Sequence, residues 1–137
     1  MSGLVLDTSV VVSGLLSPHG AAGDLVAAIF NDRLRLAYNQ DMLAEYAEVL
    51  ARPELAPGVT AQDRIAFLMK LRSSGIPVTS VPVPDDDWPD PDDLPFVAAA
   101  LATSEKVLVT LNPRDFAPAE CHGVHVLSPS AAKRRLL

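Results

Sequence analysis

The sequence predicts an α/β fold in which a mainly parallel sheet is covered by helices on both faces. Short apolar, β-branched runs alternate with stretches of helical length along the chain, and this alternation is typical of right-handed βαβ crossovers. With 137 residues, of which 49% are hydrophobic, the chain has the size of one domain that buries a core without disulfides. We therefore expect a single domain over residues 1–137.

Strands and helices alternate in the first part of the chain. Residues 3–6 form an apolar run that stops at a polar turn, and residues 35–38 resemble a second short strand. Residues 24–30 have a helical composition. Residues 41–50 are amphipathic, and their apolar side consists of Met42, Tyr46, Val49 and Leu50.

The second part continues the same alternation. Thr60 and Asp63 have the spacing of a capping box, which predicts a helix that runs to Gly75. Residues 76–83 are extended, but their prolines restrict them to an edge strand. Residues 94–102 are almost wholly apolar, which suits a buried helix. The last expected elements are strands over residues 106–110 and 123–127 and a helix that begins at Ser128 and Pro129.

The composition excludes several classes of protein. The longest apolar runs, such as residues 96–102, are far shorter than the roughly 20 residues of a membrane span, and no basic and apolar leader opens the chain. Cys121 is the only cysteine, which excludes an internal disulfide and a four-cysteine metal site. We expect a soluble protein of the reducing cytoplasm, without a membrane partner.

The net charge of -6 does not decide the partner. Affinity for nucleic-acid phosphates normally comes from lysine and arginine, so an acidic chain is at first sight a poor nucleic-acid binder. Six of the 17 acids, however, lie within nine residues, and so dense a cluster repels itself unless it is solvated or neutralised by cations. The six are Asp85, Asp86, Asp87, Asp90, Asp92 and Asp93.

Acids and amides stand where predicted strands end or helices begin. Asp7 follows the first strand, residues 90–93 precede the apolar helix, and residues 112–115 follow a later strand. Glu45 lies within a helix at the border of its apolar stripe, whereas Glu48 points away from that stripe. Because ligands bind beyond the carboxyl ends of parallel strands, these oxygens predict a site for a hard divalent cation such as Mg²⁺.

Each of these residues also has a purely structural interpretation. Asp7 can cap a short helix after the first strand, Glu45 can be a solvated helix residue, and Asp92 or Asp93 can cap the apolar helix. Local backbone hydrogen bonds or surface charge can account for the other polar candidates, namely Ser9, Thr110, Arg114 and residues 133–135. The joint placement of several acids at one sheet edge favours a site.

Other site chemistries find less support. Neither a phosphate-binding glycine loop nor a Gly-x-Ser-x-Gly motif occurs. A phosphotransfer domain also needs a strand-end aspartate, but the dehalogenase kind needs a second acid where Ser9 stands, and no lysine follows a late strand as in receiver domains. Helical metal-binding spacing, which zinc sites use, is missing from the three histidines, His19, His122 and His125.

Four sequence motifs are distinctive. They are residues 6–16 (LDTSVVVSGLL), residues 43–53 (LAEYAEVLARP), residues 90–96 (DPDDLPF) and residues 109–116 (VTLNPRDF). Together they closely resemble the PIN-domain family, and the most similar group is the PIN toxins of bacterial toxin-antitoxin modules. The order and spacing of the motifs agree from residue 4 to residue 127, so the resemblance covers nearly the whole chain.

The resemblance implies a three-layer α/β/α domain with an acidic pocket for one or two Mg²⁺ or Mn²⁺ ions. By position, the family's site residues correspond to the acids Asp7, Glu45 and Asp93, the further acid Asp90, and the pocket-lining Ser9 and Thr110. The chain departs from the family at Asn112 in the same pocket, where many members have an aspartate. Either Asp115 substitutes for it, or a second ion is held weakly through water.

These observations predict a ribonuclease that hydrolyses RNA phosphodiester bonds with a metal-activated water. The residues expected to be catalytic are Asp7, Glu45, Asp93 and Asp115. Arg114 and Arg52 are candidates for contacts with RNA phosphates. The resemblance further implies a small protein antitoxin and a homodimer. The alternative function is a PIN scaffold that binds RNA or a protein partner without cutting, and Asn112 keeps this alternative open.

Overall fold

The computed structural model describes residues 3–83, 88, 90–120 and 122–137. Within them it contains a five-stranded sheet whose strands are all parallel, in the order β3-β2-β1-β4-β5. The predicted α/β fold is therefore confirmed. The strands are β1 (Gly3–Leu6), β2 (Arg35–Tyr38), β3 (Ile76–Pro77), β4 (Val107–Val109) and β5 (His125–Leu127).

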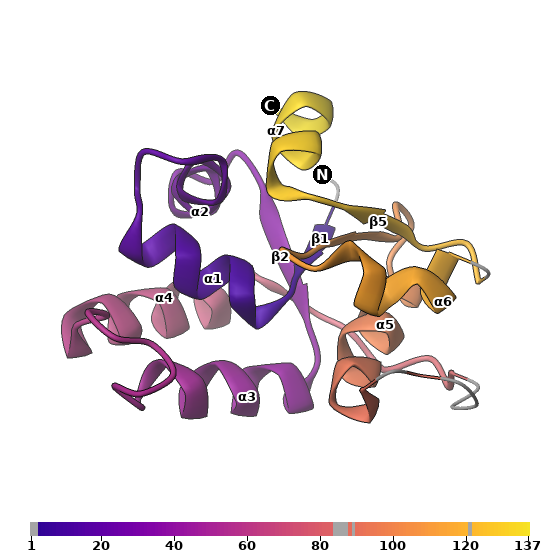
Figure 1. Cartoon of the computed structure of the whole chain (residues 1–137), viewed down its shortest axis with the longest axis horizontal. Helices are drawn as coiled ribbons and strands as arrows, with labels where there is room; N and C mark the ends of the chain where they lie inside the picture. The colour runs from indigo at the N-terminus through magenta and orange to yellow at the C-terminus, as the bar shows by residue number, and fades with distance from the viewer. Residues whose placement is uncertain (1–2, 84–87, 89, 121) are drawn as a thin grey trace.

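Seven α-helices and two 3₁₀ helices surround this sheet in the described part of the chain (Figure 1). The α-helices are α1 (Thr8–Leu16), α2 (Ala21–Phe30), α3 (Gln40–Leu50), α4 (Ala61–Ser74), α5 (Leu94–Leu101), α6 (Ala117–Glu120) and α7 (Pro129–Leu136). The 3₁₀ helices are η1 (Pro91–Asp93) and η2 (Pro113–Phe116). No single described helix is long and apolar enough to cross a membrane; only α1 and α2 together, bent by 93°, have the length and composition.

The predicted caps of α4 and α7 are confirmed. Thr60 Oγ1 accepts a hydrogen bond from Asp63 N (3.0 Å), and Asp63 Oδ2 accepts one from Thr60 N (3.4 Å), which forms the capping box of α4. Ser128 Oγ accepts a hydrogen bond from Ala131 N (3.1 Å) at the start of α7. The structure adds η1, η2 and α6, which are too short to show a periodic pattern in the sequence.

The extended segment after α4 forms only a short edge strand. β3 covers the first two of residues 76–83 and pairs with β2 at one edge of the sheet. Val78 N still donates to Tyr38 O (2.8 Å), but Val81 N donates to Ala98 O of α5 (3.2 Å). Because prolines in this segment cannot donate to a ladder, the chain leaves the sheet and crosses onto α5.

The helices form two layers, one on each face of the sheet. From β1 the chain moves to β2 and β3 in one direction, and it then returns to β4 and β5 on the other side of β1. Right-handed crossovers place the connecting helices of these two halves on opposite faces. Figure 1 shows α1 to α4 on one side of the central strands and α5 and α6 on the other. The last helix, α7, packs against α2 and β5.

This change of direction creates a crevice between the carboxyl ends of β1 and β4. Leu6 of β1 pairs with Val109 of β4 at this end, and Asp7 and Thr110 are the next residues along the chain. In open α/β sheets, ligands bind where the strand order reverses. The topology thus brings together two predicted site residues that are 103 positions apart in the sequence.

A buried tyrosine fixes α3 against the end of β1. The side chain of Tyr46 is fully buried, and its ring meets those of Phe67 (5.6 Å between centroids) and Phe96 (6.2 Å) edge to face. Its hydroxyl donates a hydrogen bond to the carbonyl of Leu6. Tyr46 therefore connects α3 with α4, α5 and β1, and this contact brings the preceding residue, Glu45, to the crevice.

Tyr46→Phe removes the buried hydroxyl and keeps the ring contacts. We expect the free energy of unfolding to fall by about 1–3 kcal/mol, because the carbonyl of Leu6 loses a buried donor. Urea denaturation measures this change. The control is Tyr38→Phe. The ring of Tyr38 is also buried, but the Tyr38 hydroxyl makes no hydrogen bond within the described residues, so we expect the free energy of unfolding to fall by less than about 0.5 kcal/mol. Equal losses in the two variants would contradict the assignment.

Candidate active site

Asp7 stands at the crevice, and two hydroxyls hold its side chain. Its backbone N–H donates to Val109 O (2.9 Å), which extends the pairing of β1 with β4. Ser9 Oγ (2.9 Å) and Thr110 Oγ1 (2.8 Å) both donate to Asp7 Oδ2. Within the described residues no donor reaches Asp7 Oδ1, so this oxygen keeps its lone pairs for another partner.

The interpretation of Asp7 as a helix cap is wrong. Asp7 occupies the N-cap position of α1, but its side chain accepts no hydrogen bond from the helix backbone. The reading of Ser9 and Thr110 as groups that serve only the local backbone is also wrong, because both donate to Asp7. Thr110 is fully buried, and its oxygen additionally accepts from Asn112 N (3.1 Å). The hydroxyls therefore orient the carboxylate.

Glu45 reaches the crevice from α3, as its helical position predicts. Thr8 Oγ1 donates a hydrogen bond to Glu45 Oε2. Burial raises the pKa of Glu45, the hydrogen bond from Thr8 opposes the shift, and the negative charges of three nearby aspartates add to it. Glu48, by contrast, is exposed and forms an ion pair with Arg52 (2.7 Å). The two glutamates of α3 thus have different surroundings, although they are only three residues apart.

The segment before α5 brings a second group of acids. Asp90 caps η1, because its Oδ1 accepts a hydrogen bond from Asp92 N (3.0 Å). Asp93 occupies the N-cap position of α5, but its side chain makes no capping hydrogen bond. Asp93 is therefore the N-cap residue of α5, as one of the two expected alternatives, but without a side-chain cap, and the side-chain cap in this segment is that of Asp90 on η1. Burial raises the pKa of Asp93 to about 7, and the charges that add to this shift are those of Asp7, Asp90, Asp115 and Glu45.

Sequence analysis did not identify Asn39, which connects α3, the helix of Glu45, with α5, the helix that follows Asp93. Its Oδ1 accepts a hydrogen bond from Met42 N (2.9 Å) and caps α3. Its Nδ2 donates to Pro95 O (2.9 Å) in the first turn of α5. An asparagine between a strand and an amphipathic helix signals a cap, but the contact with α5, 56 positions later, has no local signal.

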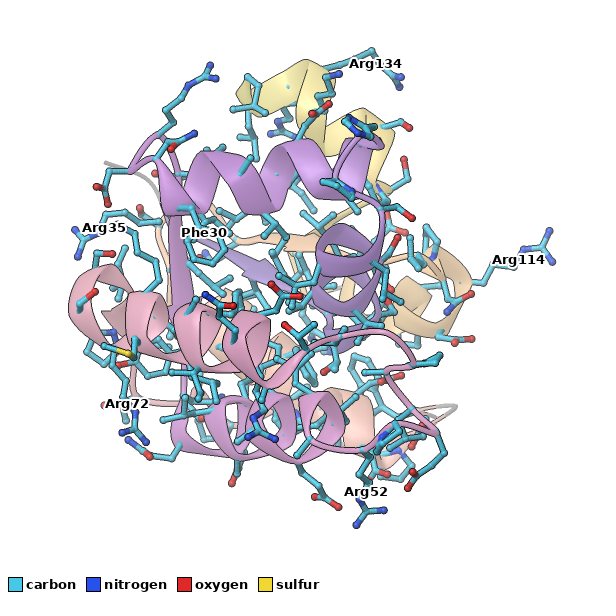
Figure 2. All side chains as sticks on the ribbon, turned by 90° about the vertical axis from the view of Figure 1, so that its left-hand side faces the viewer. Phe30, Arg35, Arg52, Arg72, Arg114 and Arg134 are labelled. Carbon is cyan, nitrogen blue, oxygen red and sulfur yellow. The ribbon has the colours of Figure 1, made fainter. Side chains whose placement is uncertain are left out.

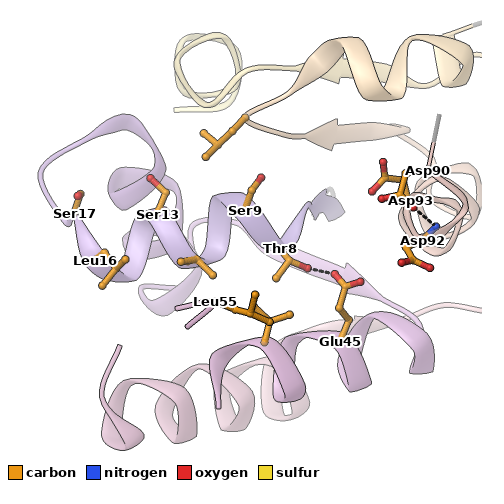
Figure 3. A pocket seen from close by; sticks show the side chains of 13 residues that line it. Thr8, Ser9, Ser13, Leu16, Ser17, Glu45, Leu55, Asp90, Asp92 and Asp93 are labelled. Atoms are coloured by element: carbon orange, nitrogen blue, oxygen red, sulfur yellow. Dashed lines mark hydrogen bonds between the residues drawn. The ribbon is translucent and has the colours of Figure 1, made fainter. Parts of the chain in front are cut away.

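These elements border an open cleft of about 660 Å³ (Figure 3). One half of the cleft is acidic, and the other half is formed by hydroxyl and aliphatic side chains. Leu16, Leu55 and Leu111 are exposed in this second half. The described lining residues are Thr8, Ser9, Val12, Ser13, Leu16, Ser17, Glu45, Val49, Leu55, Asp90, Asp92, Asp93 and Leu111.

Asp7 and Thr110 are not among these lining residues, and four further predicted site residues, which are exposed, also lie outside the lining. Asp115 nevertheless contributes to the pKa shift of Asp93, whereas Asn112 contributes its backbone N–H to Thr110. Figure 2 shows the side chains of Arg52 and Arg114 extending outward from the body of the protein. Other residues singled out from the sequence lie outside the described ones: Asp85, Asp86, Asp87 and Cys121.

A comparison with protein families decides the relationship. The family model of the PIN domain matches residues 3–114, which extend from β1 into η2. The chain belongs to the PIN-domain family. PIN domains are nucleases and typically use divalent metal ions. Searches of characterised proteins and of solved structures gave no match.

The oxygen donors of this PIN domain fit Mg²⁺ or Mn²⁺. Carboxylates are the ligands that these hard cations prefer, and no ion pair within the described residues includes Asp7, Glu45 or Asp93. The described part of the chain contains no group of three or more His, Cys, Asp or Glu residues that could hold a metal ion by themselves. Mg²⁺ needs only one or two carboxylates, since waters and substrate phosphates complete its shell. The arrangement therefore suits an ion whose coordination shell is completed by water or phosphate oxygens.

The PIN domain without metal should lose stability as the pH rises. The pKa of Asp93 is raised from 3.8 to about 7, so the folded state favours the protonated carboxyl. Its contribution to stability is complete below about pH 4 and is lost as the pH rises through about 7. In EDTA, we expect the melting temperature to fall between about pH 4 and about pH 7 and to level off above that. Scanning fluorimetry measures the fall.

Asp93→Asn should flatten this pH dependence, because the amide does not titrate. The matched control is Asp92→Asn, one residue away, which should keep most of the slope of the wild type, because Asp92 adds to the pKa shift of Glu45 and not to that of Asp93. Glu45 contributes in the same direction, so part of the slope remains in Asp93→Asn. An unchanged slope in Asp93→Asn would refute the assignment. Mg²⁺ should raise the melting temperature of the wild type most at the alkaline end, where the carboxylates repel one another.

Proposed function

We propose that this PIN domain is a metal-dependent ribonuclease that hydrolyses RNA phosphodiester bonds in the acidic half of the cleft. The supporting observation is the convergence of Asp7, Glu45 and Asp93 from three separate segments, with the pKa values of Glu45 and Asp93 raised by burial and by neighbouring carboxylates. Divalent cations relieve such repulsion. They also reverse the local charge, so that a cleft that repels RNA when metal-free attracts phosphate.

The acids have distinct roles in this proposal. Asp7 is a metal ligand whose orientation is fixed in advance by two hydroxyls, which saves the cost of ordering it on binding. Glu45 from α3 and Asp93 before α5 complete the site, and Asp90 offers a further oxygen. When bound, the cations would neutralise the scissile phosphate and acidify a water molecule. In the metal-free protein the pKa of Asp93 is about 7, and a bound cation would lower it and keep this carboxylate ionised.

Asp115 takes the place of the aspartate that this chain lacks at position 112. Asp115 is one of the charges that raise the pKa of Asp93, which indicates that it lies within electrostatic reach of the site. Asn112 contributes only a backbone hydrogen bond to Thr110. Of the two candidate phosphate contacts, Arg114 is the better placed, because Arg52 is paired with Glu48. Loss of activity in Asp115→Asn but not in Asn112→Ala would support the role of Asp115 in place of an aspartate at position 112. The reverse result would contradict this role.

We also propose that the chain is the toxin of a toxin-antitoxin pair, acts in the cytoplasm and forms a homodimer. The resemblance of its motifs to PIN toxins supports this role. The exposed leucines beside the acids provide an apolar surface for a small protein inhibitor, whose arginine side chains would pair with the carboxylates. Expression in bacteria should arrest growth with the wild type and not with Asp7→Asn. Equal growth of both strains would count against the toxin role.

A PIN scaffold without nuclease activity is the second candidate function. Two observations favour it. Position 112 is the amide Asn112, and the described part of the chain contains no group of three or more residues that could hold a metal ion by themselves. Such a scaffold would bind RNA or a protein partner through the same cleft. It differs from the nuclease in one measurable respect, since loss of a site carboxylate would then leave RNA integrity unchanged.

Substitution of the site carboxylates should abolish cleavage of RNA. We expect Asp7→Asn and Glu45→Gln to lower the rate of Mn²⁺-dependent cleavage of a fluorescent single-stranded RNA by about 100-fold or more. The matched control is Glu48→Gln on the same helix, which should retain the activity of the wild type. Similar rates in Glu45→Gln and Glu48→Gln would sink the assignment of the site. Activity in EDTA would contradict the need for a metal.

A further inference from the structure

The cleft continues into two further hollows that lead toward the C-terminal helix. The second hollow has a volume of about 250 Å³ and shares Ser13, Ser17 and Leu111 with the cleft. The third has a volume of about 430 Å³ and shares Ala21 and Ser130 with the second. Because neighbouring hollows share lining residues, the three follow one another from the site acids along α1 to α7, and we call this series the serine groove.

Serine hydroxyls mark the course of the groove along α1. Ser9, Ser13 and Ser17 follow one another at intervals of four residues, and Figure 3 shows their hydroxyls on the same side of the helix. At a rise of 1.5 Å per residue, they span about 12 Å of the helix. The first of them donates to Asp7, so the row of hydroxyls begins at the proposed metal site.

The charge of the lining changes from acidic to basic along this path. The cleft contains Glu45, Asp90, Asp92 and Asp93, whereas no acid is found among the described residues that line the second and third hollows. The third hollow is instead lined by two basic residues of α7, Lys133 and Arg134. The path therefore joins an acidic end to a basic end.

The two basic residues differ in their surroundings. Lys133 Nζ forms an ion pair with Asp24 Oδ2 (2.7 Å), which ties α7 to α2 beside the groove. Arg134 is exposed, and no ion pair within the described residues includes it. Figure 2 shows its side chain extending from α7. Arg134 is thus available to a phosphate without first losing a protein partner.

We propose that the serine groove binds the single-stranded RNA substrate on one side of the scissile phosphate, with Arg134 as a contact for a backbone phosphate several nucleotides away. This inference rests on the proposed nuclease function, and it involves a helix beyond the residues that the family model matches. Hydroxyls both donate and accept hydrogen bonds, as does the ribose 2′-OH that distinguishes RNA from DNA. The hollows have volumes of about 250, 430 and 660 Å³, no larger than small-ligand pockets, which favours a single strand over a duplex.

The groove also answers the question of how an acidic chain holds RNA. With a net charge of -6, the protein gains little from nonspecific attraction, and cations in the cleft act only on the phosphates that they touch. Affinity for the rest of the strand then depends on local contacts, and removal of each phosphate contact lowers both the affinity and its dependence on salt.

Binding of a uridine dodecamer, measured by fluorescence anisotropy in Mg²⁺, tests the groove directly. Asp7→Asn serves as a background in which cleavage is silenced. In this background Arg134→Gln should weaken binding by about threefold and lower the slope of log affinity against log salt by about 0.7. The matched control is Arg72→Gln on α4, whose side chain is exposed and lies far from Arg134 in Figure 2; it should leave binding unchanged.

Equal dissociation constants for the Arg134→Gln and Arg72→Gln proteins would overturn the proposal that the serine groove binds RNA. A loss of affinity without a change in the salt slope would also overturn it, because the lost contact would not be ionic. The nuclease function is tested separately, by cleavage of the same dodecamer by the wild type in Mn²⁺. If RNA binding depends on Arg134 but the wild type does not cleave the dodecamer, the serine groove is an RNA-binding surface and the proposed nuclease function is wrong.

Discussion

The rest of the site depends on the two hydroxyls that hold one oxygen of Asp7. Ser9 approaches from the first turn of α1 and Thr110 from the end of β4, so their hydrogen bonds connect both sides of the crevice where the strand order reverses. Both donors are neutral, so they fix the carboxylate without cancelling its charge. A lysine or arginine in either place would neutralise Asp7 and weaken its attraction for a cation.

The fold supplies the energy that keeps like charges together. Asp7, Glu45 and Asp93 repel one another, and uncharged contacts nearby oppose this repulsion. Tyr46 ties α3 to β1 through the carbonyl of Leu6, and Asn39 ties the start of α3 to the first turn of α5. These contacts resist the outward movement of the helices. Functional sites are often locally unstable, because they hold side chains of like charge close together at a cost in the free energy of folding.

The sequence predicted what depends on local pattern and missed what depends on distant contacts. The helical angle distinguished Glu45 from Glu48, and the capping box located the start of α4. The pairing of Asp7 with Thr110 and the bond from Asn39 to α5 join positions far apart in the chain, so no local pattern marks them. The serine groove was missed for the same reason, because α7 reaches α2 only through the tertiary fold.

We propose that Asp7, Glu45 and Asp93 together hold a divalent cation. Anomalous diffraction from crystals grown with Mn²⁺ tests it most directly, since the peak locates the ion independently of activity. The account predicts one or two peaks in the acidic half of the cleft, the first within about 2.6 Å of Asp7 Oδ1, with Glu45 or Asp93 or their bound waters as further ligands. A cleft without a peak at saturating Mn²⁺, or an ion bound only by other residues, would contradict it.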